Sequence, residues 1–134
     1  MNRKLKFRLG LGVALGMISA IVVLYFYVYQ SHRDIDAEKA AFETSVSELS
    51  QRFINNSDSS TETYADQTIS IYGNVTALDL KQNTITLDNK LIATTSKDEM
   101  NSAKMGELVK LKGRFIGYDE LFNELRMDQC TIEE

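Results

Sequence analysis

Apolar and polar side chains alternate along two stretches near the end of the chain. In residues 109–115 the odd positions are apolar or glycine and the even positions are basic, and a similar alternation follows in residues 125–128. Successive side chains of an extended chain point to opposite faces, so each stretch predicts a strand that is buried on one side. The glycine and aspartate of residues 117–120 favour a turn. The pattern therefore predicts a hairpin over residues 109–132.

Three more strands are predicted upstream of this hairpin. Residues 69–77 alternate over a long stretch, and Gly73 in its middle predicts a bulge or a bend. Turn-forming residues then separate two shorter strands, at residues 84–87 and 91–95. The polar residues 96–106 predict a short helix or a compact loop that ends in glycine.

The order of these elements predicts a mainly β fold. Five strands, an insertion between the third and the fourth, and a long first strand bent at a glycine are typical of an OB-fold barrel. The barrel would occupy residues 69–134, with its first strand pairing in both halves. Closure removes the two edges that a flat sheet would expose. The alternative is an open five-stranded sheet backed by the helix that precedes it.

Residues 34–55 precede the barrel and predict an amphipathic helix. Apolar residues recur there at the spacing of one helical face: Ile35, Phe42, Val46, Leu49 and Phe53. We expect this face to pack on the barrel, and the alternative is a partner helix or a coiled coil. Residues 56–68 predict a polar linker with at most one short helical turn.

An uncharged stretch, residues 9–29, predicts a transmembrane anchor. A helix of this length spans about 30 Å, the thickness of the hydrocarbon core of a bilayer. Residues 1–8 before it carry four basic side chains: Arg3, Lys4, Lys6 and Arg8. The positive-inside rule then predicts a single-pass protein of the cytoplasmic (inner) membrane, with its N-terminus inside and its C-terminal domain extracytoplasmic. The alternative is a cleavable signal peptide. It fits less well, because the candidate cleavage site after Ser19-Ala20 has Ile18 at its −3 position, where a small residue is needed.

Two features of the anchor concern its neighbours. Gly12, Gly16 and Ala20 share one helix face, and such small residues let two membrane helices approach closely, so a homodimer is possible. Small residues are also common in membrane helices that do not pair. His32 and Arg33 follow the anchor, and we expect them to lie among the lipid headgroups.

The charge of the chain is divided unevenly. Four of its 15 basic residues precede the anchor, which leaves 11 against all 19 acidic residues in the rest, a net charge of −8. Nucleic acids and anionic membrane surfaces attract basic proteins, so this balance disfavours both as partners of the domain.

The residue types needed for common catalytic sites are missing from the domain. His32, the one histidine, lies at the membrane boundary, and Cys130 is the one cysteine, so neither a nucleophile–base pair nor a usual zinc site is expected. Four acids surround the last hairpin: Asp119, Glu120, Glu124 and Asp128. They predict a solvated face balanced by nearby bases, and the alternatives are a carboxylate pair or a weak calcium site. The sequence therefore predicts no enzyme, no cofactor and no metal.

The last strand contains a change of register. Leu125 and Met127 share one parity, whereas Cys130 and Ile132 share the other. If all four face the core, one extra residue must be inserted near residues 128–129. Cys130 is then predicted to be buried, and the alternative is an intermolecular disulfide.

Three stretches of the domain resemble one family. Residues 69–75 (ISIYGNV) are similar to the I-x-V-x-G-x-V first strand of the tRNA_anti-like OB-fold domains. Residues 111–118 resemble the fourth strand and turn of that family, and residues 125–132 resemble its last strand, cysteine included. The resemblance covers about residues 35–134. Members are small domains, often tethered to bacterial membranes by a helix or a lipid. The resemblance implies an OB-fold and little else, since function does not follow from fold.

A candidate ligand surface follows from the expected barrel. OB-folds bind ligands across one face and its framing loops, which here are the predicted turns 81–83 and 117–120. The candidate residues on this surface are Tyr72, Asn74, Lys112, Arg114 and Tyr118. Tyr118 is expected at the tip of a turn, and the alternative is that it folds back over the end of the barrel and that the basic residues serve only solubility. We expect it to bind an envelope protein, a peptide or a small ligand, and the alternative is a nucleic-acid-binding OB-fold domain.

Overall fold

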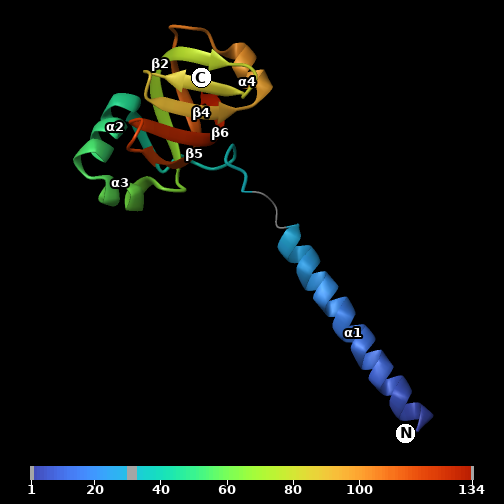
Figure 1. Cartoon of the computed structure of the whole chain (residues 1–134). Coiled ribbons are helices and arrows are strands. Elements are labelled where there is room, and N and C mark those ends of the chain that lie inside the picture. Colours follow the sequence, from blue (N-terminus) through green and yellow to red (C-terminus); the bar gives the residue numbers. More distant parts are fainter. Residues whose placement is uncertain (1, 30–32, 134) are drawn as a thin grey trace. The chain divides into compact units, whose positions relative to one another are not determined.

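The computed structural model describes residues 2–29 and 33–133 (Figure 1). Contacts within the chain divide it into two compact units, Met1–Arg33 and Asp34–Glu134. His32 and its expected position among headgroups lie outside the described residues.

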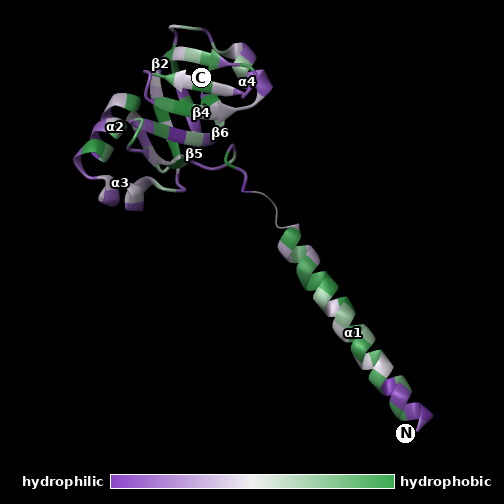
Figure 2. Cartoon of the chain, viewed as in Figure 1, coloured by the Kyte–Doolittle hydropathy of each residue, from purple (hydrophilic) through white to green (hydrophobic). Residues whose placement is uncertain are grey.

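The first unit is a single helix, α1 (Arg3–Val28), which is long and apolar enough to cross a membrane. Figure 2 shows hydrophobic residues along most of its length and hydrophilic ones at its N-terminal end. The helix has the composition of an anchor, and a signal sequence would look the same by this test. Gly12 and Gly16 have open space around them, and pairing of two helices through this face stays a prediction.

The second unit contains a closed five-stranded barrel. Its strands are β2 (Thr68–Asp79), β3 (Thr84–Leu87), β4 (Leu91–Thr95), β5 (Leu108–Asp119) and β6 (Glu124–Glu133). They neighbour one another in the order β2-β3-β4-β6-β5, and β5 pairs with β2 to close the circle. The β4–β6 pair is parallel, and the other pairs are antiparallel. This arrangement confirms the OB-like barrel, so the open sheet is wrong.

Strand β2 is shared between the two halves of the barrel, as predicted. It pairs with β5 from Thr68 to Asn74 and with β3 from Val75 to Asp79. The barrel interior is filled by buried apolar side chains from all five strands: Ile69, Ile71, Val75, Ile85, Leu87, Leu91, Ala93, Leu111, Phe115, Leu125, Met127 and Cys130.

The amphipathic helix before the barrel is shorter than predicted. Helix α2 (Val46–Asn55) covers the second half of residues 34–55, and the first half is not helical. Phe42–Ser45 form strand β1, which pairs in parallel with β2 and adds a sixth strand to the sheet. The helix begins where Ser45 is extended and its hydroxyl accepts a hydrogen bond from the Glu48 backbone N–H at 3.1 Å, which caps the first turn.

The predicted linker 56–68 contains a second helix, α3 (Ser57–Tyr64). The Asn56 side chain caps it by accepting a hydrogen bond from the backbone N–H of Ser59 at 3.1 Å. At its other end, the Tyr64 ring packs against Phe42 with ring centroids 4.9 Å apart. The helix is longer than the one turn expected in this linker, and the buried Tyr64 ring and the Asn56 cap help to hold this polar segment in place.

Two predictions about local irregularities have different outcomes. The extra residue in β6 is confirmed, because β5 and β6 slip in register between Lys112 and Arg114, and Gln129 has a φ of +50°. In β2 the slip lies between Val75 and Ala77 rather than at Gly73. A Cβ at Gly73 would lie 2.9 Å from a Val46 methyl carbon, so this glycine lets the start of α2 approach the strand.

The insertion between β4 and β5 contains the expected short helix, α4 (Lys97–Ser102). The Ser96 hydroxyl caps it by accepting from the Glu99 N–H at 3.3 Å. Gly106 follows with a φ of +79°, a backbone conformation that favours glycine.

Candidate ligand-binding surface

The basic side chains on the outer face of β5 are bonded within the chain. Lys110 Nζ lies 3.0 Å from a Glu43 carboxylate oxygen, and this hydrogen bond raises the pKa of Lys110. Lys112 Nζ donates to the backbone carbonyl of Asp36 at 2.8 Å. Each cationic group therefore has an acceptor from outside its own strand.

Arg114 is paired more closely than either lysine. Its Nε donates to Asp128 Oδ1 at 2.9 Å and a second guanidinium nitrogen donates to the other carboxylate oxygen, while Asp66 lies 3.5 Å away. Hydrogen bonding to Asp128 raises the pKa of Arg114. The two bonds to one carboxylate fix the orientation of the guanidinium and occupy two of its nitrogens, while 35% of the Arg114 side chain stays exposed.

Tyr72 and Asn74 lie on the outward side of β2. Tyr72 is 41% exposed, and it lines a hollow of about 550 Å³ together with Leu108 and Ile132. Asn74 donates to Asp88 Oδ1 from both its backbone N–H, at 3.1 Å, and its side-chain amide, at 3.3 Å. Asn74 thus ties β2 to the β3–β4 turn, whereas Tyr72 is open to solvent.

Tyr118 is not at a turn tip but folds back against the core, which is the second of the two arrangements expected from the sequence. Its ring packs on Phe53, with centroids 5.2 Å apart, and its hydroxyl donates to Asn123 Oδ1 at 2.6 Å. The register of β5 slips between Phe115 and Gly117, so Ile116 points out and Tyr118 turns toward the core. The structure therefore separates Tyr118 from the other four candidate residues, which lie on the outer face of β2 and β5.

The turn of the last hairpin lies at residues 120–123, three positions later than predicted. Asp119 Oδ1 accepts hydrogen bonds from the backbone N–H groups of Leu121, at 3.0 Å, and Phe122, at 3.3 Å. Asn123 closes the turn with a φ of +55°. Leu121 is 92% exposed and Phe122 is 69% exposed, so the turn presents two large apolar side chains to solvent.

The β2–β3 turn is built in the same way. Asp79 Oδ1 accepts from the N–H groups of Lys81, at 2.9 Å, and Gln82, at 3.2 Å, and Asn83 has a φ of +53°. This turn carries an exposed apolar residue of its own, Leu80 (67% exposed), but positions 81 and 82 are polar, so the geometry does not require apolar residues at those two positions. The likeness of the two turns is visible in the sequence, because both have an Asp-x-x-x-Asn spacing. The exposed apolar pair Leu121–Phe122 was not among the residues predicted to bind a ligand.

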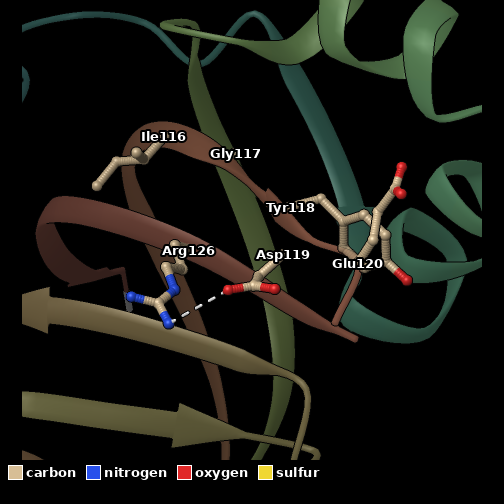
Figure 3. Close-up of a pocket in the computed structure, with 6 residues that line it drawn as sticks. All are labelled: Ile116, Gly117, Tyr118, Asp119, Glu120 and Arg126. Atoms are coloured by element: carbon tan, nitrogen blue, oxygen red, sulfur yellow. Dashed lines mark ion pairs between the residues drawn. The ribbon is translucent and has the colours of Figure 1, made fainter. Parts of the chain in front are cut away.

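A hollow of about 420 Å³ lies beside the β5–β6 turn (Figure 3). It is lined by Ile116, Gly117, Tyr118, Asp119, Glu120 and Arg126. Figure 3 shows the Arg126 guanidinium turned toward Asp119, with 3.8 Å between the charged atoms, while the Glu120 carboxylate points away from Arg126. A second hollow, of about 310 Å³, lies between this turn and the end of α2, and Tyr118 and Glu120 line both.

Three of the four acids around this hairpin lie beside one of two bases. Arg126 lies 3.8 Å from Asp119 and 3.5 Å from Glu124, and Asp128 belongs to Arg114. Within residues 2–29 and 33–133, no group of three histidine, cysteine or acidic side chains could hold a metal ion.

Cys130 is 2% exposed, as predicted for a core position. Burial raises the pKa of its thiol, which keeps it protonated and unreactive. A Cβ at Gly113 on the neighbouring strand would lie 2.5 Å from Cys130 Sγ, so the sulfur fills the space above that glycine. A thiol held in this way cannot reach a second chain to form a disulfide.

Comparison with known proteins identifies the fold and no family. No family model matches the sequence, and no curated protein matches it either. A solved structure of a lipoprotein from Klebsiella pneumoniae, to which nucleic-acid binding is provisionally ascribed, has a TM-score of 0.51 at 12% identity, over 69% of this chain and 91% of that one. A protein from Leishmania major, provisionally described as an aspartyl-tRNA synthetase, has a TM-score of 0.43 at 11% identity, over 84% of this chain and 25% of that one. The likeness to the lipoprotein shows a common OB-like fold, and membership of the tRNA_anti-like family stays a prediction.

Proposed function

We propose that this chain is a membrane-anchored, extracytoplasmic binding module whose OB-like barrel recognises a protein or peptide of the cell envelope. Helix α1 supplies the anchor, and its basic N-terminal end gives the orientation, with the N-terminus in the cytoplasm. The barrel is then the exported part. Catalysis has no role in this proposal.

One observation carries the choice of ligand class: the three cations of the basic strip on β5 (Lys110, Lys112 and Arg114) are bonded within the chain, two of them to carboxylates and Lys112 to a backbone carbonyl. Lys110, Lys112 and Arg114 each contact an oxygen atom of another segment, at 3.0, 2.8 and 2.9 Å respectively. A protein that binds a nucleic-acid backbone needs cations that are free to replace the counterions of phosphates. The exposed groups at the β5–β6 turn are instead two apolar side chains flanked by acids, which suits a polypeptide.

Binding of single-stranded nucleic acid is the second candidate. It is favoured by the exposed rings of Tyr72 and Phe122, on which bases could stack. The same activity is ascribed to the lipoprotein from Klebsiella pneumoniae, but at 12% identity the likeness concerns the fold alone. Stacking without a basic groove gives weak binding, so we rank this candidate second.

Protease accessibility tests the anchoring and the orientation. Protease added to intact spheroplasts that contain the full chain should remove the barrel and leave α1 in the membrane. A cytoplasmic marker protein should stay intact in the same sample. Protection of the barrel in intact spheroplasts would contradict the proposal. Titration with a single-stranded oligonucleotide, set out at the end of the Discussion, tests the ligand class.

A further inference from the structure

We propose that Leu121 and Phe122 form a docking tip for a polypeptide partner that offers an apolar pocket bordered by lysine or arginine. This inference rests on the proposed function and names the partner surface that the barrel would use. The tip lies at the β5–β6 turn, at the far end of the hairpin from the basic strip of β5.

The first step is that folding does not explain the apolar tip. The two Asp-x-x-x-Asn turns share the same hydrogen bonds and the same positive φ at their last residue. At their third and fourth positions one turn carries Lys81 and Gln82 and the other carries Leu121 and Phe122. At the second position the first turn has the exposed Leu80, so it presents one apolar side chain where the other presents two side by side. Large apolar side chains in water gain nothing for the fold, and together they expose a surface of the kind found at protein interfaces.

The second step is that two further exposed apolar side chains and two hollows border the residue next to the tip, Glu120. Ile116 and Ile54 are 52% and 51% exposed, and each lines one of the two hollows beside the turn. These hollows, of about 420 and 310 Å³, share Tyr118 and Glu120 as a common wall. Projecting apolar side chains flanked by hollows can interdigitate with side chains of a partner, as interface anchors do.

The third step concerns the charged residues around the tip, which indicate the charge that a partner should carry. Asp119, Glu120 and Glu124 surround the tip, and Arg126 is the base that contacts two of them, at 3.8 and 3.5 Å. The remaining negative charge repels phosphate backbones and anionic lipid headgroups, which attract basic surfaces. It complements lysine or arginine at the border of an apolar pocket, which is why we choose a polypeptide over a bilayer.

The test begins with site-specific photo-crosslinking in the cells that produce the protein. The full chain carries a photoreactive amino acid in place of Phe122 or, as the matched control, in place of Gln82 in the other turn. Mass spectrometry then identifies the molecule and the segment that is attached at each position. We expect attachment from position 122, and not from position 82, to a segment of another protein that combines apolar residues with lysine or arginine.

The attached segment is then synthesised as a peptide and titrated against the full chain in phosphatidylcholine nanodiscs. The variant with both Leu121→Lys and Phe122→Gln places the residues of the other turn at this tip, so it should fold normally and bind about tenfold or more weakly. Glu120→Lys should also weaken binding, and a lysine-to-glutamate change in the peptide should restore it. Lys81→Leu with Gln82→Phe should leave binding unchanged.

Attachment from position 122 to lipid, to nucleic acid or to a second copy of this chain would overturn the inference, as would no attachment at all. Equal binding of the peptide by the Leu121→Lys, Phe122→Gln variant would also overturn it. A further sample carries the photoreactive amino acid in place of Tyr72. Attachment of an envelope protein there but not at position 122 would refute the docking tip and leave the proposed function standing. Failure of the proposed function itself would appear separately, as a protected barrel in spheroplasts or as salt-sensitive oligonucleotide binding.

Discussion

Arg114 and Asp128 face each other across β5 and β6, where the Arg114 Nε donates to Asp128 Oδ1 at 2.9 Å and a second nitrogen donates to the other oxygen. The pair lies beside the β6 bulge at Gln129, which has a φ of +50°. The bulge changes the parity of β6 and places Asp128 opposite Arg114 in the register. One pair thus secures an irregular part of the sheet and also neutralises a cation of the outer face.

Asp128→Asn should destabilise the barrel, because an amide offers only one acceptor and brings its NH2 group against the guanidinium. Both side chains are partly exposed, so we expect a loss of about 1 kcal/mol after allowing for solvent screening. Thermal unfolding of the full chain in nanodiscs, followed by tyrosine fluorescence, should show a Tm lower by about 4–8 °C. Glu120→Gln is the control, with an expected change within about 0.5 kcal/mol. An unchanged Tm in Asp128→Asn would show that the pair contributes nothing.

Gly113→Ala should destabilise the fold more strongly. Its Cβ would lie 2.5 Å from Cys130 Sγ and 2.8 Å from the backbone carbonyl oxygen of Asp128. The side chain could move but the backbone oxygen could not, so we expect a loss of about 2 kcal/mol or more. Gly117→Ala is the matched control on the same strand, because a Cβ there meets no atom within 4 Å. Equal Tm values for the two variants would contradict the packing described for β5 and β6.

The pH dependence of stability should report the hydrogen bonds of the Glu48 carboxylate in the first turn of α2. Hydrogen bonding to Arg52 and then to Thr44 holds the pKa of Glu48 below its usual value of 4.5. The unfolded chain therefore binds this proton more readily, so the stabilisation is present above about pH 4.5 and is lost as the pH falls through the lower folded value. Between about pH 6 and pH 3 the Tm should fall further in the wild type than in Glu48→Gln. Parallel Tm profiles for the two proteins would argue against this assignment.

The barrel could be predicted from the sequence because its strands alternate cleanly and its turns carry glycine, asparagine and aspartate. The first half of the predicted helix failed for a physical reason. Phe42 fits the spacing of a helical face, but it also pairs in a strand with Ile69, and that partner lies 27 positions further along the chain. Local periodicity could not choose between these two arrangements, because the decision depends on a contact distant in sequence.

The candidate surface was predicted only in part, again because of register. Tyr118 has the parity of Arg114 in the sequence, and one bulged residue, Ile116, turns it to the opposite face. A single inserted residue leaves no local signature, so the parity argument could not detect it. The apolar tip at Leu121 and Phe122, in contrast, carries a visible signal in the repeated Asp-x-x-x-Asn spacing.

The most direct test of the proposed function is a titration of the full chain, in phosphatidylcholine nanodiscs, against a labelled single-stranded oligonucleotide at about 50 and about 200 mM salt. The basic side chains of β5 are bonded within the chain, so we predict no binding up to about 100 μM protein at either salt concentration. The account would be contradicted by a micromolar Kd at the lower salt that weakens steeply at the higher salt and is lost in a folded Lys112→Glu variant.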